Sequence, residues 1–180
     1  EQGHEVILCE KSGVLGGAIL CETAVPFKKK LGMYLAAHAR AALKAGIDLR
    51  LNTEATPEYA ESLGADVIIA ALGSRPAVPN IPGIGGGNVL GAETAYRHPE
   101  RVGDRAVVIG AGLVGLELAL YLSLLGKTAC VVEAADKLSD GGNMLHANAL
   151  MIQLKNRGIP IRLNTGAAAI TRDGVVCRTA

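Results

Sequence analysis

A glycine-rich turn between an apolar strand and a run of helix formers constrains this chain more than any other feature. The strand-forming residues 105–109 lead directly into Gly110-Ala111-Gly112-Leu113-Val114-Gly115, and residues that favour a helix follow. Glu133 lies 23 positions after Gly110, at the end of the next apolar run. Three glycines alone are a weak signal, but strand, turn, helix and distant acidic residue together are the fingerprint of a dinucleotide-binding βαβ unit.

Each glycine of this turn meets a different physical need. Gly110 permits the tight turn, Gly112 lets a pyrophosphate approach the backbone, and Gly115 lets the helix pack on the strand. Free N–H groups at the start of the helix, with the positive end of its dipole, attract the phosphates. Glu133 can accept hydrogen bonds from both adenine-ribose hydroxyls and would repel a 2′-phosphate, so we expect NAD(H) rather than NADP(H) despite Lys137 nearby. Glycines that serve helix packing alone are the alternative.

The sequence also repeats itself. Residues 3–10 share their pattern with residues 126–133, which lie 123 positions later, and residues 46–53 recur as 158–165 with six of eight positions identical. Two repeats in the same order indicate two copies of one α/β unit rather than a solenoid. The first-copy counterpart of the glycine turn would precede residue 1, so we expect the first unit to lack its opening strand and turn. The second unit is expected to lack its last strand.

Apolar periodicity predicts strands that alternate with helices. The predicted strands are 5–9, 47–51, 67–72, 105–109, 128–132 and 159–163, and the predicted helices are 28–45, 112–125 and 144–157. This alternation predicts an α/β fold of Rossmann-like, doubly wound parallel sheets. The proline- and glycine-rich segment 73–91 is interpreted as a crossover, and we place the boundary between units 1–95 and 96–180.

Composition and charge exclude several other functions. The formal net charge is +1 without a long run of like charges, so we expect neither nucleic acid nor a membrane surface as a partner. No apolar stretch reaches the roughly 20 residues of a membrane helix, and the first residues form no signal peptide, so a cytoplasmic location is expected. No metal site is expected, because no histidine or cysteine pair has ligand spacing; the scattered histidines are His4, His38, His98 and His146.

Further motifs carry a resemblance to a known family. Glu10 is the first-copy counterpart of Glu133, and Gly16-Gly17 follows it closely. The later strings are Ala70-Ala71-Leu72-Gly73-Ser74-Arg75-Pro76 and Ile81-Pro82-Gly83. With the glycine turn, these motifs resemble the two-dinucleotide flavoproteins, which bind FAD in an outer unit and NAD(P)H in an inserted unit. The resemblance covers essentially the whole chain and implies a partial FAD-binding domain over 1–95 and an NAD(P)-binding domain over 96–180.

The resemblance also implies residue roles. In the first unit, Glu10 and Lys11 look like the FAD-ribose residues, Gly16 and Gly17 like those near the FAD phosphates, and Gly73 like the turn that leaves the FAD unit. A solvated strand end and a plain turn are the alternatives, and Ala71-Leu72-Gly73 departs from the commoner Ala-Thr-Gly. The second unit contributes Gly110, Gly112, Leu113, Val114, Gly115, Glu117 and Glu133. The family counterpart of Glu117 lies near the nicotinamide; the alternative is a partly exposed helix residue.

Cysteine usage selects a branch of the family. Disulfide reductases need a second, resolving thiol, whereas Cys21 is the lone cysteine after the glycine pair and is interpreted as structural. What remains resembles the C-terminal half of NADH:flavin oxidoreductases related to 2,4-dienoyl-CoA reductase and trimethylamine dehydrogenase. This resemblance implies hydride transfer from NADH to FAD and a barrel domain upstream that holds FMN and an iron–sulfur cluster.

Two other functions stay open at this point. One is a non-catalytic module that binds ADP or another nucleotide, and the other is the small flavoprotein subunit of a glutamate-synthase-like complex. No acid–base catalytic residue is assigned, and the 180-residue chain alone is expected to be inactive. Homo-oligomerisation is possible, because strands without neighbours would leave apolar surface for a second chain to cover.

Overall fold

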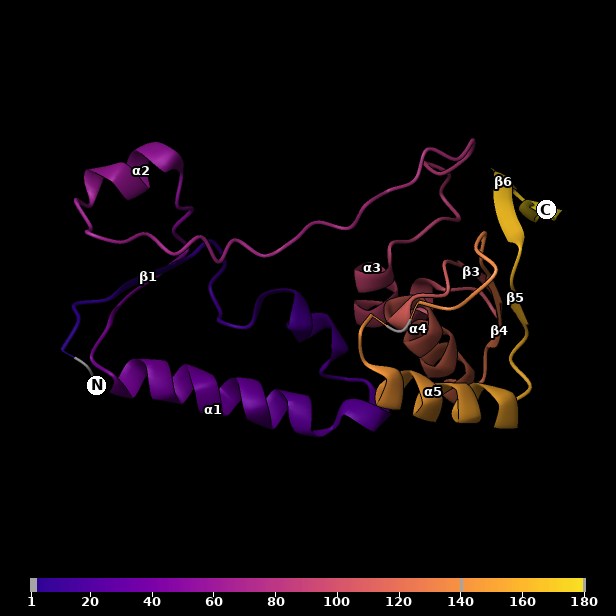
Figure 1. The fold of residues 1–180 in the computed structure, drawn as a ribbon, viewed down its shortest axis with the longest axis horizontal. Helices are drawn as coiled ribbons and strands as arrows, with labels where there is room; N and C mark the ends of the chain where they lie inside the picture. Colours follow the sequence, from indigo (N-terminus) through magenta and orange to yellow (C-terminus); the bar gives the residue numbers. More distant parts are fainter. Residues whose placement is uncertain (1–2, 140, 180) are drawn as a thin grey trace. The chain divides into compact units, whose positions relative to one another are not determined.

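The computed structural model describes residues 3–139 and 141–179, and the chain divides into two compact units, Glu1–Arg75 and Pro76–Ala180. The first unit contains one β–α–β crossover (Figure 1). Strand β1 (Ile7–Glu10) pairs in parallel with β2 (Asp48–Leu51). The segments between and after them are η1 (Gly17–Glu22), η2 (Pro26–Lys28), α1 (Lys30–Lys44) and α2 (Pro57–Ser62). The parallel pair agrees with the predicted first copy.

The first unit contains little buried apolar surface. Cys21 and Val25 are its buried apolar residues among those described, and no residue of α1 is buried. Val6, directly before β1, and Ile7 and Leu8 within it are between 36% and 46% exposed. A two-stranded sheet is marginal by itself. The two strands of this unit therefore need further neighbours to cover them.

The prediction of a strand over 67–72 was wrong. The segment forms no ladder in the described structure, and Ile69 is 85% exposed. Its Val-Ile-Ile pattern has the β propensity of a buried strand, but propensity reflects packing against neighbouring strands. Among the described residues of the first unit, β1 and β2 pair only with each other. Residues 67–72 therefore form no strand, because no described strand of the first unit pairs with them.

The second unit is built on a three-stranded parallel sheet in the order β3-β4-β5. Its strands are β3 (Arg105–Ile109), β4 (Thr128–Val132) and β5 (Ile161–Arg162), joined by α4 (Leu113–Leu124) and α5 (Met144–Asn156). Arg105 lies opposite Thr128, and Val131 lies opposite Ile161. The short elements α3 (Ala92–Arg97) and η3 (Pro99–Arg101) precede the sheet. The predicted α/β class with parallel pairing is confirmed.

An antiparallel hairpin follows the parallel sheet and was not predicted. It consists of β6 (Thr165–Thr171) and β7 (Gly174–Thr179), with a register shift between Ala167 and Ala169. The alanine-rich β6 lacks the apolar alternation that announces a strand. The hairpin is instead tied to the crossover segment, because the Ile170 N–H donates to the Pro82 carbonyl at 2.8 Å and the Asn88 side chain donates to the Thr171 carbonyl.

The core of the second unit is centred on α4. All residues from Leu116 to Leu122 are buried, so this helix is enclosed on every side rather than on one stripe. Val131 of β4 and Leu154 of α5 are fully buried as well. Each fully buried side chain of this size contributes roughly 1.5–3 kcal/mol. Tyr96 and Tyr121 stack with ring centroids 5.6 Å apart, which joins α3 to α4.

The internal repeat extends to individual hydrogen bonds. Asn52 and Asn164 occupy the same repeat position, and both adopt a left-handed backbone with φ of 53° and 48°. The Asn52 N–H donates to the Ser12 carbonyl at 3.0 Å, and the Asn164 N–H donates to the Ala135 carbonyl at 2.9 Å. The following residues repeat the pattern, since the Thr53 N–H donates to the Glu10 carbonyl and the Thr165 N–H to the Glu133 carbonyl. The two units therefore share the same hydrogen-bonding pattern at the end of the repeated strand.

The left-handed asparagine supports a direct stability test. We expect Asn164→Val to lower the free energy of unfolding of the second unit by about 1–2 kcal/mol, because a branched Cβ is strained in this region. Asn164→Gly should be close to neutral. Urea denaturation provides the measurement, and Asn156→Val is the matched control because Asn156 ends α5 in a right-handed backbone. Equal effects of the two valine variants would contradict the backbone explanation.

Candidate nucleotide-binding site

The glycine turn connects β3 to α4 as expected from the sequence. Gly110 has φ of 107°, and its N–H donates to the Val132 carbonyl at 2.8 Å. A Cβ atom on Gly115 would lie 2.1 Å from the Gly110 carbonyl oxygen, so only glycine permits this approach of α4 to β3. Gly112 caps the helix, and a Cβ there would meet nothing within 4 Å. The backbone thus leaves open space at the position expected to face a pyrophosphate.

Glu133 is bonded directly to this turn. Its Oε2 accepts a hydrogen bond from the Ala111 N–H at 2.7 Å, and its Oε1 accepts one from the Ala135 N–H at 2.9 Å. These backbone donors, Ala111 first, hold the pKa of Glu133 below its usual range. An anionic carboxylate therefore lies where β4 ends, beside the glycine turn.

Substitutions at two glycines separate packing from binding. We expect Gly115→Ala to destabilise the second unit by about 1–3 kcal/mol, because the added methyl group forces α4 away from β3. Gly112→Ala should leave the unfolding free energy nearly unchanged but should weaken NAD⁺ binding at least tenfold, because its methyl group would occupy the open space. Urea denaturation and titration calorimetry give the two measurements. Unchanged NAD⁺ affinity in a folded Gly112→Ala variant would favour the alternative of glycines that serve packing alone.

The lowered pKa of Glu133 predicts a pH-dependent contribution to stability. Because the folded-state pKa lies below the unfolded value of about 4.3, the carboxylate stabilises the fold above that pH, and this contribution is lost as the pH falls through the folded pKa. Glutamine has one acceptor oxygen for two N–H donors. We therefore expect Glu133→Gln to lower the unfolding free energy by about 1–3 kcal/mol at pH 7.

The difference in unfolding free energy between wild type and Glu133→Gln, measured by urea unfolding, should shrink as the pH falls below about 4.3 and through the lower folded-state pKa of Glu133. Asp173→Asn, on the exposed turn of the hairpin, is the control and should show no comparable difference. A Glu133→Gln difference that stays constant from neutral to acidic pH would show that the carboxylate charge does not stabilise the turn.

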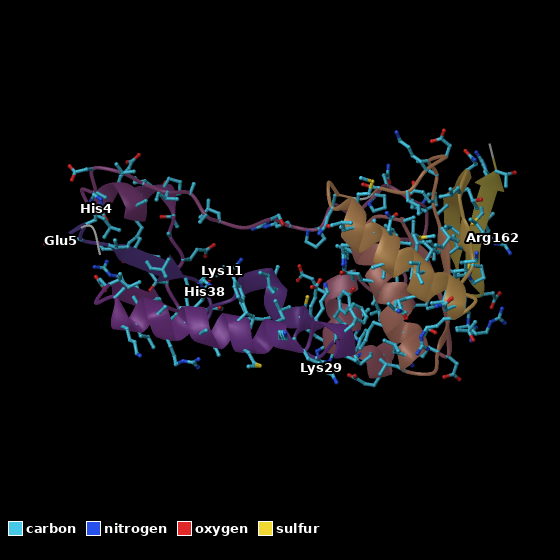
Figure 2. The ribbon with its side chains drawn as sticks, turned by 60° about the horizontal axis from the view of Figure 1, so that its bottom comes forward. His4, Glu5, Lys11, Lys29, His38 and Arg162 are labelled. Carbon is cyan, nitrogen blue, oxygen red and sulfur yellow. The ribbon has the colours of Figure 1, made fainter. Side chains whose placement is uncertain are left out.

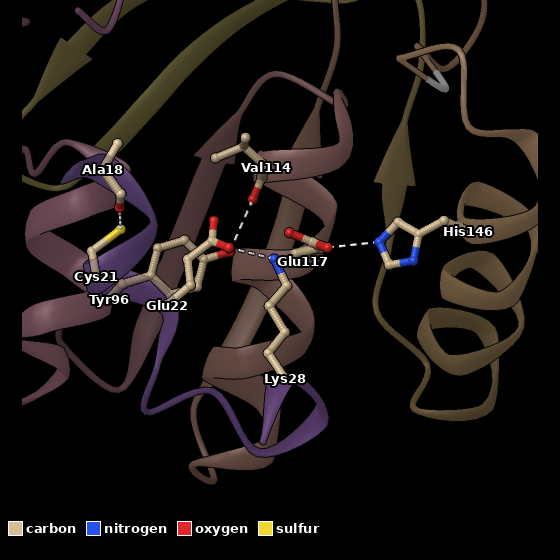
Figure 3. A network of polar contacts seen from close by, with 8 residues as sticks. All are labelled: Ala18, Cys21, Glu22, Lys28, Tyr96, Val114, Glu117 and His146. Atoms are coloured by element: carbon tan, nitrogen blue, oxygen red, sulfur yellow. Dashed lines mark hydrogen bonds and ion pairs between the residues drawn. The ribbon is translucent and has the colours of Figure 1, made fainter. Parts of the chain in front are cut away.

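Glu117 and His146 form a pair between α4 and α5 (Figure 3). The Nε2 atom of His146 lies 2.6 Å from Oε1 of Glu117, and Glu117 is only 5% exposed. The alternative for Glu117, a partly exposed helix residue, is therefore wrong, whereas its place near the nicotinamide stays a prediction. Sequence reasoning set His146 aside as one of four scattered histidines. The two residues lie 29 positions apart, so no local motif connects them, and only the packing of α5 beside α4 brings them together.

The first unit places its candidate residues around the end of β1. Glu10 Oε1 accepts a hydrogen bond from the Ser12 N–H at 2.7 Å, and this backbone donor lowers the pKa of Glu10. The same i to i+2 contact joins Glu133 to Ala135 in the other copy. Lys11 is exposed directly after the strand (Figure 2). Gly16 and Gly17 have positive φ at the start of η1, and Gly73 has a positive φ in the extended segment.

The cysteines and histidines form no further site in the described structure. The Cys21 thiol is buried and donates to the Ala18 carbonyl at 3.0 Å, which agrees with a structural role. Cys9 and Cys130, which lie within apolar runs of the sequence, are partly buried. Across residues 3–139 and 141–179, no cluster of three or more histidine, cysteine or acidic residues could hold a metal ion. No helix in these same ranges is both long and apolar enough to cross a membrane.

The chain belongs to the pyridine nucleotide-disulphide oxidoreductase family, whose model matches residues 2–180. This result confirms the family resemblance inferred from the nucleotide motifs. Cinnamate reductase from Clostridium sporogenes is 33% identical over 99% of this chain and 27% of its own length. NADH oxidase from Thermoanaerobacter brockii is 31% identical over 97% of the chain and 29% of its own length.

The fold likeness is similarly extensive. A 2-naphthoyl-CoA reductase in complex with 2-naphthoyl-CoA has a TM-score of 0.87 and 27% identity, and the match covers 99% of this chain and 27% of that one. The chain thus spans little more than a quarter of the length of these relatives. Its membership identifies a pyridine-nucleotide flavoprotein oxidoreductase domain.

Proposed function

We propose that this chain is the nucleotide-binding part of an NADH-dependent flavoprotein reductase, in which NADH bound to the second unit reduces FAD bound partly by the first. The observation that carries the proposal is the open space at Gly112, where an added Cβ would meet no atom within 4 Å, next to the turn that the Glu133 carboxylate contacts. The names of the relatives, a reductase and an NADH oxidase, support the reaction class. A nicotinamide and a flavin supply hydride transfer when bound, and the protein supplies binding, orientation and electrostatics.

The second unit would hold the nucleotide through its backbone and one carboxylate. The N–H groups at the start of α4, with Leu113 and Val114 in its first turn, would face the pyrophosphate. Glu133 already accepts two backbone N–H bonds, but a carboxylate offers about four acceptor positions, so it can also accept ribose hydroxyls. Its negative charge would repel a 2′-phosphate, which favours NAD(H). Glu117, on the same helix, would lie toward the nicotinamide end.

The first unit would contribute one side of the FAD site. Glu10 with Lys11 would bind the ribose, and Gly16 and Gly17 would approach the phosphates. Gly73 would form the turn through which the chain leaves the FAD unit. The repeat supports this assignment, because Glu10 accepts from the backbone in the same way as Glu133. We infer that 1–95 is a partial FAD-binding domain and 96–180 an NAD(P)-binding domain, although the crossover segment packs with the second compact unit.

The unpaired edge of β1 in the described part of the first unit indicates that a further strand pairs with it in the whole protein. In the second unit, β3 pairs with the edge of β4 and carries the glycine turn. The equivalent edge of β1 has no such partner in the described residues. We infer that a strand and turn equivalent to 105–115 complete the FAD site in the whole protein. A separate barrel domain with FMN and an iron–sulfur cluster would accept the electrons from FAD.

The proposed function can be tested by comparing how wild type and Glu133→Gln bind NAD⁺ and NADP⁺. In titration calorimetry on the full-length protein, we expect Glu133→Gln to weaken NAD⁺ binding about tenfold, which corresponds to 1.4 kcal/mol. NADP⁺ binding should stay the same or improve, because the repulsion of the 2′-phosphate is removed. Asp173→Asn should change neither affinity, because this carboxylate is exposed on the hairpin turn.

The outcomes distinguish the proposed functions. A yellow protein whose flavin absorbance is bleached by NADH supports the reductase. A colourless protein that still binds NAD⁺ through Glu133 would instead be the non-catalytic nucleotide module. A folded protein that binds neither dinucleotide would refute the proposed nucleotide site altogether.

A further inference from the structure

The Glu117–His146 pair is unusual for its surroundings. Glu117 is the one charged residue of α4, a helix buried on all sides from Leu116 to Leu122. Its side chain is 7% exposed, while that of His146 is 38% exposed. A separation of 2.6 Å between Oε1 and Nε2 is typical of a strong hydrogen bond to a charged group. The pair therefore joins an enclosed carboxylate to a ring that reaches solvent.

Stability alone does not explain this carboxylate. Removing a carboxylate from water costs several kcal/mol, and a buried pair often only balances that cost. A leucine or glutamine at position 117 would suit an apolar helix better. An enclosed carboxylate that adds little net stability is a candidate for a ligand-binding group. The position of Glu117 points to the same conclusion, because it lies four residues after Leu113, about 6 Å along the helix axis from the nucleotide turn.

His146 is itself held in a fixed position. It lies in the first turn of α5, and its backbone N–H donates to Oδ1 of the N-cap residue Asn143 at 3.2 Å. The preceding Gly141 lies close to α4, since a Cβ there would be 3.2 Å from Leu113 Cδ1. Glu133, directly after β4, contacts the glycine turn, and His146, in the first turn of α5, contacts Glu117. Both contacts are therefore made by residues of the connection from β4 into α5.

We propose that His146 is a positioning residue that orients the Glu117 carboxylate to accept a hydrogen bond from the carboxamide N–H of the nicotinamide ring. This inference rests on the proposed binding of NAD(H) to the second unit. The imidazole Nε2–H takes one acceptor position of the carboxylate, at Oε1, and thereby fixes the plane of the group. The pair then selects a nicotinamide that bears an N–H donor. A site that hydrogen-bonds a ligand N–H discriminates against the analogue that lacks it.

The test compares NAD⁺ with its 3-acetylpyridine analogue, in which a methyl group replaces the amide NH₂. In titration calorimetry on the full-length protein, we expect the wild type to bind NAD⁺ about tenfold more tightly than the analogue, the effect of one lost hydrogen bond to a charged group. His146→Leu and His146→Asn should reduce this ratio to about two or less, because neither places a donor at the Nε2 position. His146→Gln should largely restore it, because its amide nitrogen reaches that position.

A matched control is available in the same unit. His98 also lies beside a carboxylate, with Nδ1 3.1 Å from Oε1 of Glu100, but both side chains are exposed. His98→Leu should leave the NAD⁺-to-analogue ratio unchanged. A general structural effect of losing a histidine would alter the melting temperature without altering this ratio.

The possible results separate the inference from the proposed function. An unchanged ratio in His146→Leu and His146→Asn, in a protein that still binds NAD⁺, would overturn the role of His146 and leave the nucleotide site intact. Loss of discrimination in His146→Gln as complete as in His146→Leu would also overturn it. A wild-type protein that is folded but binds neither compound would overturn both the inference and the proposed function.

Discussion

The hydrogen bond from the Ala111 N–H to the Glu133 carboxylate is the contact on which the second unit depends most. It joins the turn after β3 to the end of β4, and the other carboxylate oxygen accepts from Ala135. The backbone of Glu133 continues the link, because its carbonyl accepts from Thr165 at the start of β6. Glu133 thus connects the parallel sheet to both the glycine turn and the hairpin. The proposed ribose contact would use the same carboxylate that organises the fold.

The two copies share this hydrogen-bond design but differ in how they are stabilised. In the second unit the glycine turn leads into α4, in which every residue from Leu116 to Leu122 is buried. In the first unit Glu10 makes the equivalent contact with Ser12, but β1 and α1 have little apolar surface covering them. Local geometry is therefore encoded by the repeat sequence itself, whereas stability requires additional strands and helices. Glu10 and Glu133 are themselves both partly exposed, so the two copies differ in the core beside the motif and not in the burial of the carboxylate.

The sequence predicted those features that depend on local patterns or on repetition. The turn at 110–115, the parallel pairs and the position of Glu133 follow from glycine spacing and apolar periodicity. The repeated Leu-Asn-Thr string was recognised as well, but the left-handed backbone of Asn164 within it was not predicted. The prediction over 67–72 was wrong because strand formation requires a neighbour that no local pattern reveals. The hairpin was missed because alanines carry little alternation. His146 was missed because its contact with Glu117 arises from helix packing across 29 positions.

The family name refers to disulphide chemistry, but the cysteines of this chain do not support that chemistry. Dithiol exchange requires a thiolate that is accessible and has a second thiol in reach. Cys21 is buried and donates to the Ala18 carbonyl, and all four cysteines are free thiols. The features that this chain shares with the two-dinucleotide pattern are instead backbone turns and carboxylates, which we propose bind nucleotides. Because a glycine turn and an acidic strand end are independent of the thiols, the nucleotide geometry persists where the dithiol pair is absent.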